Sequence, residues 1–326
     1  MFVKYLPGLF CCALAAGLAG TAGAAGDFPT QPVRLVVSAP AGSTPDTGAR
    51  AVAQPMSQAL GQPVVVENRP GANGLIAVQE VLKSAPDGHT LLLAAGSTMA
   101  INPHIYTDQP ADVLKDLVAA GKIYSTDFYL MVRADSGIAD VATLVERARA
   151  RPGSLVAANG GPGSASQLIA ERLKQQAGID LYQVPFNGSP AAALGVASGN
   201  ADLLFETLAV TEPFVASGRA RRIATTGQSR SAAHPDLPTM AEAGVPDMEI
   251  SSWAGLFART AVPAERIARV NEALNRALAE PAVRKVLESA GLAPGGGSAA
   301  DFQREWHAQS DLWAEVVART PGMTKH

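Results

Sequence analysis

Hydrophobic and polar positions along the chain form two alternating patterns. Short runs of β-branched and apolar residues predict buried strands, and longer stretches with helical spacing predict amphipathic helices. In the first block the strands are expected at 33–37, 64–66 and 90–94, and the helices at 45–60 and 75–84. Strands that alternate with helices are typical of a mainly parallel sheet flanked by helices. The pattern therefore predicts the α/β class.

A second block repeats this alternation after residue 127. Strands are expected at 128–132, 155–158, 181–184, 201–205 and 222–226, and helices at 141–150, 165–177 and 190–197. A proline-rich stretch over 234–246 leads to a final strand at 250–257, and helices follow at 263–278, 282–289 and 300–318. Two such blocks in a chain of 326 residues predict two α/β domains.

The N-terminal segment has the layout of a secretory signal peptide. Lys4 precedes an apolar run over 6–18, and small residues follow up to residue 26. This order, with Ala22-Gly23-Ala24 as a small-x-small site, predicts removal of residues 1–25 and export to the periplasm. Both cysteines lie in the same segment, so the mature chain is expected to contain no disulfide and no cysteine metal site.

The charge balance argues against nucleic acid as a partner, and the hydropathy argues against a membrane-spanning segment in the mature chain. The 26 basic and 29 acidic residues leave the chain slightly acidic, whereas nucleic-acid binding requires a concentrated basic face. No apolar stretch after the signal segment reaches the roughly 20 residues that a bilayer requires. We therefore expect a protein that binds no nucleic acid, and nothing in the sequence indicates an interface, so we expect a monomer.

The most informative residues lie where predicted strands lead into helices. Four such junctions are rich in Gly, Ser, Thr and Asn and contain neither Lys nor Arg: residues 39–46, 95–99, 159–164 and 185–190. Ligands of open α/β sheets bind beyond the carboxyl ends of the strands, where these junctions lie. A helix N-terminus there offers free N–H groups and a partial positive charge. Together the loops predict an anion site without cationic side chains.

Helix capping is the alternative interpretation of these loops. Thr44 before Pro45 and Ser189 before Pro190 are typical caps, and Ser164 with Gln167 has capping-box spacing. The apolar residues near the loops are equally open to two interpretations. Met99, Phe186 and Phe205 would form a wall suited to an aromatic or longer-chain acid, or they pack in the core.

Catalytic motifs are absent from the sequence. It contains no Gly-x-Ser-x-Gly elbow and no phosphate-binding loop, and the five histidines are scattered without metal-ligand spacing. His89 follows Asp87-Gly88 in a turn and is expected at the surface. Asp46 and Glu206 are the only acidic residues in or beside the loops, and an acid in a first helical turn needs no catalytic explanation. We predict no catalytic residue, cofactor or metal.

Several segments in fixed order resemble a known family, the tripartite tricarboxylate transporter receptors (Bug or TctC-type solute-binding proteins). The segments that carry the resemblance are 31–37 with Ala41-Gly42, Asp46 and Arg50, then 60–71, 85–92, 101–103, 162–164, 184–186, 237–244 and 253–256. The resemblance covers essentially the whole mature chain. It implies a two-lobed periplasmic-binding-protein fold of type II, with residues 26–127 plus 251–326 in one lobe and 128–250 in the other.

The resemblance also implies capture of a small organic acid between the lobes by backbone amides, hydroxyls and water, followed by delivery to the membrane subunits of a tripartite transporter. The expected ligand-binding residues come from the four loops: Ala41, Gly42, Ser43, Thr44, Asp46, Ser97, Thr98, Asn159, Gly161, Gly163, Ser164, Phe186, Asn187, Gly188, Phe205 and Glu206. The chain departs from the family pattern at Ser43, Gln167, Phe186, Asn187 and Glu206, which leaves the identity of the ligand open.

Two other functions are compatible with the sequence. The closed, ligand-bound form could dock on a sensor kinase instead of a transporter. An exported hydrolase using Ser43 or Ser164 is the third hypothesis, but a serine nucleophile needs a neighbouring base, and no histidine lies near the loops in the sequence.

Overall fold

The computed structural model describes residues 1–2, 28–106, 111–231 and 234–320. Apart from Met1 and Phe2, the predicted signal peptide lies outside the described residues. Within the described ranges, no helix combines the length and the apolar character that a bilayer crossing requires.

The first part of the sheet is formed by both ends of the chain. Strands β1 (Val33–Val37), β2 (Val64–Asn68) and β3 (Thr90–Ala95) are parallel, and β9 (Ser251–Arg259) pairs antiparallel with β3. The short β10 (Ala293–Pro294) pairs with β4 (Leu117–Arg133). The accompanying helices are α1 (Thr44–Leu60), η1 (Ala72–Gly74), α2 (Leu75–Lys83), the π-helical turn η2 (Ser97–Ile101), α3 (Asn102–Ile105), α4 (Val113–Asp116), α9 (Ala264–Ala279), α10 (Pro281–Ser289) and α11 (Ala299–Ala318).

The second part of the sheet is formed by the middle of the chain. Its strands are β5 (Val156–Asn159), β6 (Tyr182–Pro185), β7 (Leu203–Thr207) and β8 (Ala220–Thr225), where β5 lies parallel to β6 and β7. Its helices are α5 (Val141–Ala150), α6 (Ala165–Ala177), α7 (Ser189–Ala197) and α8 (Leu208–Ala216).

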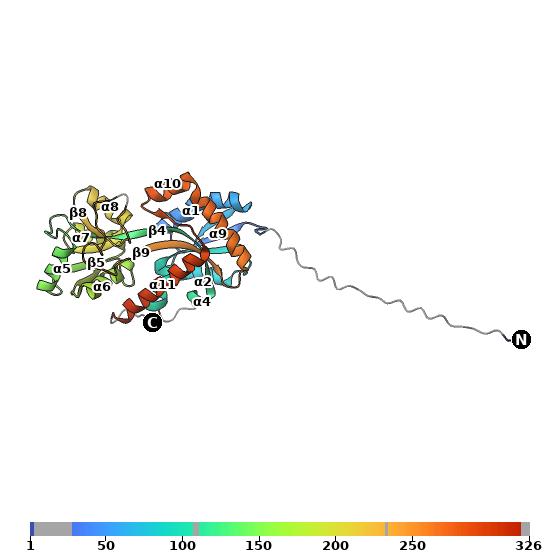
Figure 1. Ribbon diagram of the computed structural model, residues 1–326, viewed down its shortest axis with the longest axis horizontal. Coiled ribbons are helices and arrows are strands. Elements are labelled where there is room, and N and C mark those ends of the chain that lie inside the picture. The colour runs from blue at the N-terminus through green and yellow to red at the C-terminus, as the bar shows by residue number, and fades with distance from the viewer. Residues whose placement is uncertain (3–27, 107–110, 232–233, 321–326) are drawn as a thin grey trace.

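Strand β4 joins the two parts without a break. Its residues 117–127 pair with β9, and from Phe128 onward it pairs with β7 and β8 instead. Figure 1 shows β4 and β9 running between the two groups of helices. The partner of β4 thus changes between Asp127 and Phe128, while the division of the chain into the two lobes named above stays a prediction.

An aromatic cluster fixes the C-terminal helix against the sheet. Trp253 and Phe257 on β9 pack against Phe302 and Trp306 on α11, with ring centroids 4.9–5.5 Å apart. The indole Nε1 of Trp306 donates a hydrogen bond of 2.8 Å to the carbonyl of Met99 in η2. The last helix is therefore bound to the backbone that follows β3.

The periodicity predicted most elements correctly, because their buried faces follow the helical or strand period. Val33–Val37, Val141–Ala150 and Ala165–Ala177 have the predicted bounds. The prediction missed α8 and residues 117–127 of β4, and it also missed the short elements η1, η2, α3, α4 and β10. The α/β class is confirmed.

His89 corrects one expectation, because it is buried and not at the surface. Only 8% of the residue is exposed, and its Nε2 accepts a hydrogen bond of 3.2 Å from the backbone of Thr30. The ring of Phe28 packs edge-on against the imidazole at 5.0 Å between centroids. The segment before β1 thus covers the turn that contains His89.

Substituting Gly255 by alanine tests the packing of α11 on β9. A Cβ atom at this position would lie 2.2 Å from the Phe302 ring and 3.0 Å from the carbonyl oxygen of Gly121. Overpacking of this kind typically costs about 1–3 kcal/mol. We expect Gly255→Ala to lower the melting temperature by several degrees in a thermal unfolding experiment, at roughly 2–4 °C per kcal/mol.

The matched control is the double substitution Gly255→Ala with Phe302→Leu, in which the smaller side chain makes room for the new methyl group. Together the two substitutions should destabilise the protein by less than the sum of their separate effects. Additive losses would mean that the ring does not limit the space at Gly255.

Candidate functional site

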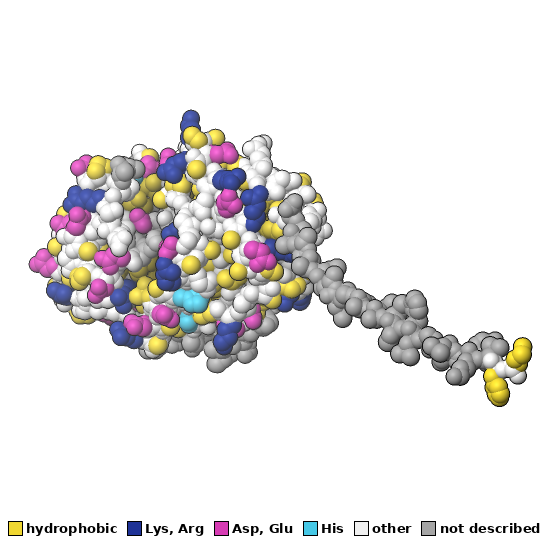
Figure 2. Space-filling view, turned by 45° about the vertical axis from the view of Figure 1, so that its right-hand side comes forward, with side chains coloured by type: hydrophobic (Ala, Val, Ile, Leu, Met, Phe, Trp, Pro, Cys, Tyr) yellow, Lys and Arg dark blue, Asp and Glu magenta, His cyan; other side chains and the backbone are white. Residues whose placement is uncertain are grey.

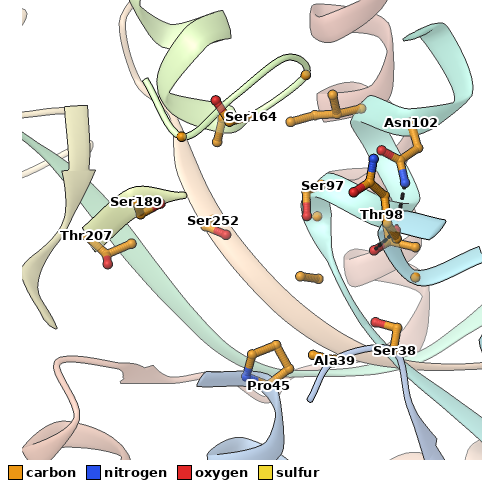
Figure 3. A pocket seen from close by; sticks show the side chains of 18 of the residues that line it. Ser38, Ala39, Pro45, Ser97, Thr98, Asn102, Ser164, Ser189, Thr207 and Ser252 are labelled. Atoms are coloured by element: carbon orange, nitrogen blue, oxygen red, sulfur yellow. Dashed lines mark hydrogen bonds between the residues drawn. The ribbon is translucent and has the colours of Figure 1, made fainter. Parts of the chain in front are cut away.

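A cavity of about 650 Å³ lies where strand ends from both parts of the sheet meet. Figure 3 shows hydroxyl-bearing side chains around it, with Ser38 and Ser97 from the first part and Ser164, Ser189 and Thr207 from the second. The lining comprises residues 38–40, 45, 70–74, 95–98, 101–102, 128, 160, 162–165, 189, 206–207, 251–252, 309 and 313. Most of these residues belong to loops and strand ends, as expected for an α/β ligand site.

Four helices begin at the wall of this cavity. Pro45 lies in the first turn of α1, Ser164 is the N-cap of α6, Ser189 is the first residue of α7, and Thr207 is the N-cap of α8. The first turn of each helix has backbone N–H groups without intrahelical partners and a partial positive charge. The four starts together create a region that favours an anion.

The start of α6 is fixed by its own side chains. The Ser164 hydroxyl accepts a hydrogen bond of 3.4 Å from the backbone of Gln167, and the Gln167 amide oxygen accepts one of 2.7 Å from Gly163. The predicted capping role of Ser164 is therefore present, and both Gly163 and Ser164 also line the cavity.

The caps of the other two predicted helix starts differ by one residue from the expectation. Ser43, not Thr44, is the N-cap of α1, and Gly188, not Ser189, is the N-cap of α7. The hydroxyl of Ser189 therefore does not cap α7 and instead donates a hydrogen bond to the Glu206 carboxylate.

The loop of residues 41–44 does not line the cavity. Ala41, Gly42 and Thr44 are exposed and Ser43 is half-buried, while the neighbouring Pro40 and Pro45 face the cavity. Asp46 causes this arrangement, because its buried carboxylate accepts the Gly42 N–H at 2.8 Å. The predicted loop is present, but its prolines and not its polar residues reach the site.

Asp46 supports this loop from behind. Its carboxylate also accepts hydrogen bonds of 3.0 Å from Arg50 and from the Asn68 amide, which in turn donates to the carbonyl of Ala39. Burial opposes ionisation of Asp46, but these hydrogen bonds and that from Gly42 outweigh it and lower the pKa of the carboxyl. Asp46 thus remains an anion that holds the first loop in place.

Two further predicted residues, Asn159 and Gly161, lie behind the wall formed by the second part of the sheet. Asn159 is buried at the end of β5, where its side chain accepts a hydrogen bond of 3.0 Å from the Gly161 N–H and donates one of 3.0 Å to Gln183. Gly161 has a positive φ of 110°, which favours glycine. Neither residue lines the cavity, but both shape the loop from which Gly163 and Ser164 do.

The aromatic wall considered above is not present. Phe205 and Met99 are 1% and 0% exposed and belong to the core. Phe186 packs beside the core of the second part, and Asn187 and Gly188 lie in the same loop outside the cavity lining. Because side chains alternate along a strand, burying Phe205 turns the next residue of β7, Glu206, towards the cavity.

Glu206 is a buried acid in the cavity wall. The residue is 6% exposed, and its carboxylate accepts hydrogen bonds from the Ser189 hydroxyl and from the Thr207 backbone N–H at 3.0 Å. Burial raises the pKa of the carboxyl, and the two hydrogen bonds only partly oppose the shift.

The loop of residues 70–74 was missed by the sequence reasoning. Ala72 and Asn73 have left-handed φ values of 45° and 51°, an unusual conformation for residues other than glycine that is often found at functional sites. The Asn73 carbonyl accepts hydrogen bonds from the Thr98 hydroxyl at 3.1 Å and the Asn102 amide at 2.9 Å. This loop therefore fixes η2, which brings the predicted residues Ser97 and Thr98 to the cavity.

The chain's C-terminal part contributes another wall that was not predicted. Gln309 and Trp313 of α11 line the cavity together with Ser251 and Ser252 of β9. Gln309 donates a hydrogen bond of 2.7 Å to the carbonyl of Ser251. No local signal could have identified these residues, because only the fold brings α11 beside the loops after β1 and β3.

The charges on the face seen in Figure 2 are interspersed, with basic and acidic side chains mixed over it. Within the part of the chain that the structure describes, Glu206 is the only charged residue in the lining, which contains neither Lys nor Arg.

Comparison with known proteins identifies the family. Residues 48–320 match the family described as the tripartite tricarboxylate transporter family receptor (TctC). A protein of the UPF0065 group from Bordetella bronchiseptica is 36% identical over 278 residues, which are 85% of this chain and 81% of the relative.

Solved structures agree with this match. A Rhodopseudomonas palustris protein with adipate is 32% identical at a TM-score of 0.76, over 90% of this chain and 98% of the other. MatC from Rhodopseudomonas palustris with bound malate is 27% identical at a TM-score of 0.73, over 89% and 100%. The chain therefore belongs to the tripartite tricarboxylate transporter receptor family, whose fold and role are those of periplasmic solute-binding receptors and not of enzymes.

Proposed function

We propose that this protein is a periplasmic receptor that captures a small organic carboxylate in the cavity and delivers it to the membrane subunits of a tripartite tricarboxylate-type transporter. The observation that carries the proposal is the start of four helices, α1, α6, α7 and α8, around one cavity whose lining, among the described residues, contains neither Lys nor Arg. Helix N-termini bind carboxylates through N–H groups and the helix dipole.

The size and polarity of the cavity support a small acid. A volume of about 650 Å³ lies in the usual range of small-molecule sites and leaves room for bridging water. The hydroxyls of Ser38, Ser97, Ser164 and Ser252 offer neutral donors and acceptors around it. Family members with 32% and 27% identity hold adipate and malate, which are both dicarboxylates.

A receptor that performs no catalysis agrees with the surroundings of Ser164. Its hydroxyl accepts the Gln167 N–H and lies 3.2 Å from the hydroxyl of Ser166, so its neighbours are neutral. Among the described residues no histidine lines the cavity. A serine nucleophile requires a base within hydrogen-bond reach. The hydrolase hypothesis therefore has no support in this geometry.

Ligand capture from both walls implies closure. Ser164, Ser189 and Thr207 belong to the second part of the sheet, whereas Ser38, Ser97 and the 70–74 loop belong to the first. A ligand that contacts both walls stabilises the closed arrangement over the open one, as in hinge-closing binding proteins. The closed, loaded form is then the species that a transporter would recognise.

The proposal predicts that a carboxylate will raise the melting temperature of the mature protein, residues 27–326. A ligand at about 100 times its Kd adds about 2.7 kcal/mol to the free energy of unfolding. At roughly 2–4 °C per kcal/mol, the melting temperature should rise by several degrees. The measurement is thermal unfolding against mono-, di- and tricarboxylates and aromatic acids, with the matching amides and alcohols as neutral controls.

The protein is first unfolded, dialysed and refolded, so that a ligand retained from expression cannot hide the effect. A shift with at least one acid and none with its neutral counterpart supports the receptor. If no acid in the panel raises the melting temperature above that of the protein without ligand, the proposed receptor function is contradicted.

A further inference from the structure

Glu206 gives the cavity a feature that carboxylate capture alone does not explain. It is the only charged residue in the lining among the described residues, and it is 6% exposed. Both of its oxygens already accept one hydrogen bond, from the Ser189 hydroxyl and the Thr207 N–H. An anion receptor with a buried carboxylate in its own wall must place its ligand so that the two negative groups stay apart.

No cation compensates this carboxylate. Within the described residues Glu206 takes part in no ion pair, and its hydrogen-bond donors are neutral. Ser189 and Thr207 stand at the starts of α7 and α8, so the two helix dipoles favour a negative charge at this place. A carboxylate has about four lone-pair positions, and the two protein donors use two of them. The remaining acceptor positions are available to a ligand.

The cavity has two regions with different chemistry, one that favours the ligand carboxylate and one at Glu206. The start of α6, at Ser164, favours the ligand carboxylate. The surface at Glu206 accepts hydrogen bonds and repels a second carboxylate. A ligand that matches both regions carries an anionic group at one end and a hydrogen-bond donor at the other.

We infer that Glu206 selects carboxylates that also bear a hydroxyl or ammonium group, and that this donor binds the Glu206 carboxylate. The inference rests on the proposed function and specifies its ligand class as hydroxy- or amino-acids over unsubstituted acids. A buried acceptor left without its donor makes an analogue that lacks the group bind more weakly. The selection is therefore built into the wall of the cavity.

The test compares parent and substituted acids of equal length on the mature protein by isothermal titration calorimetry. The probes are succinate with malate and aspartate, and adipate with 2-aminoadipate. We expect the substituted acid of at least one series to bind at least 10-fold more tightly than its parent. In Glu206→Gln, which keeps the side-chain size and removes the charge, this preference should fall below about 3-fold.

Glu146→Gln is the matched control, because it makes the same change at an exposed position of α5. It should leave the preference unchanged, and the melting temperature of each variant without ligand verifies its fold. If Glu206→Gln does not fold, the comparison of parent and substituted acids on the unaltered protein decides whether the inference holds. Parents that bind as tightly as their substituted acids, or a preference that persists in Glu206→Gln, would overturn the inference. Failure of every acid to bind the unaltered protein would overturn the proposed function, and the inference with it.

Discussion

Substituting Ser164 by aspartate is expected to weaken carboxylate binding on the order of 100-fold. Ser164 is the N-cap of α6 and lines the cavity, so the new carboxylate would stand where a ligand anion is proposed to bind. Two like charges about 5 Å apart repel by roughly 3 kcal/mol at an effective dielectric constant of about 20. Each 1.4 kcal/mol corresponds to a tenfold change in Kd. Calorimetric titration with the best acid of the thermal screen measures the loss.

The matched control is Ser164→Asn. Asparagine and aspartate cap helices about as well as serine, so both variants should keep α6 and the melting temperature of the unliganded protein. Asparagine adds similar bulk without the charge, and we expect it to change Kd by less than 10-fold. Equal losses in the two variants would mean that space, not charge, governs this part of the cavity.

Substituting Trp306 by alanine is expected to have the largest effect on stability. The side chain is fully buried between β9 and η2, where truncation of a large aromatic residue typically costs about 3–5 kcal/mol. The change also leaves the buried Met99 carbonyl without its Nε1 donor. We expect thermal unfolding to occur roughly 10 °C lower, at about 2–4 °C per kcal/mol. Since η2 contains Ser97 and Thr98, ligand affinity should decrease as well.

Two variants separate the contributions of Trp306. Trp306→Phe keeps most of the apolar contact but loses the hydrogen bond to Met99, so it should cost about 1–3 kcal/mol. His307→Ala removes an exposed ring whose centroid lies 5.0 Å from that of Trp306, and it should change stability by less than about 0.5 kcal/mol. A Trp306→Ala protein as stable as His307→Ala would show that α11 contributes little to the folded state.

The elements of this fold were predictable because each has a regular buried face. Val33–Val37 is a short apolar run with four of its five positions buried, and the buried residues of Ala165–Ala177 recur at helical spacing. The first half of β4 does not, since its register with β9 shifts twice between Ala119 and Tyr124. Such bulges interrupt the alternation on which a prediction depends. The α8 helix lacks a polar face in the sequence and was missed for a related reason.

The site was less predictable than the fold, because it depends on long-range contacts. Loop composition and helix capping indicated Ser97, Thr98, Gly163 and Ser164, and Glu206 was singled out as an acid beside the loops; all five line the cavity. Their contact with a ligand stays a prediction. The same signals favoured residues 41–44, which Asp46 turns outward by accepting the Gly42 N–H. Gln309 and Trp313 reach the cavity only through the docking of α11, which no local pattern encodes.

The pairing of the chain's two ends in one part of the sheet sets an order on folding. Synthesis proceeds from the N-terminus, so β1, β2 and β3 are complete more than 150 residues before β9 and more than 200 before Trp306. Until those partners arrive, the apolar surface of β3 that they cover remains exposed. Loops of this length also slow folding, because closing them costs entropy before any contact forms. Strands β1–β3 therefore gain their last sheet partners late, whereas β5, β6 and β7 pair with one another within the middle of the chain and can form earlier.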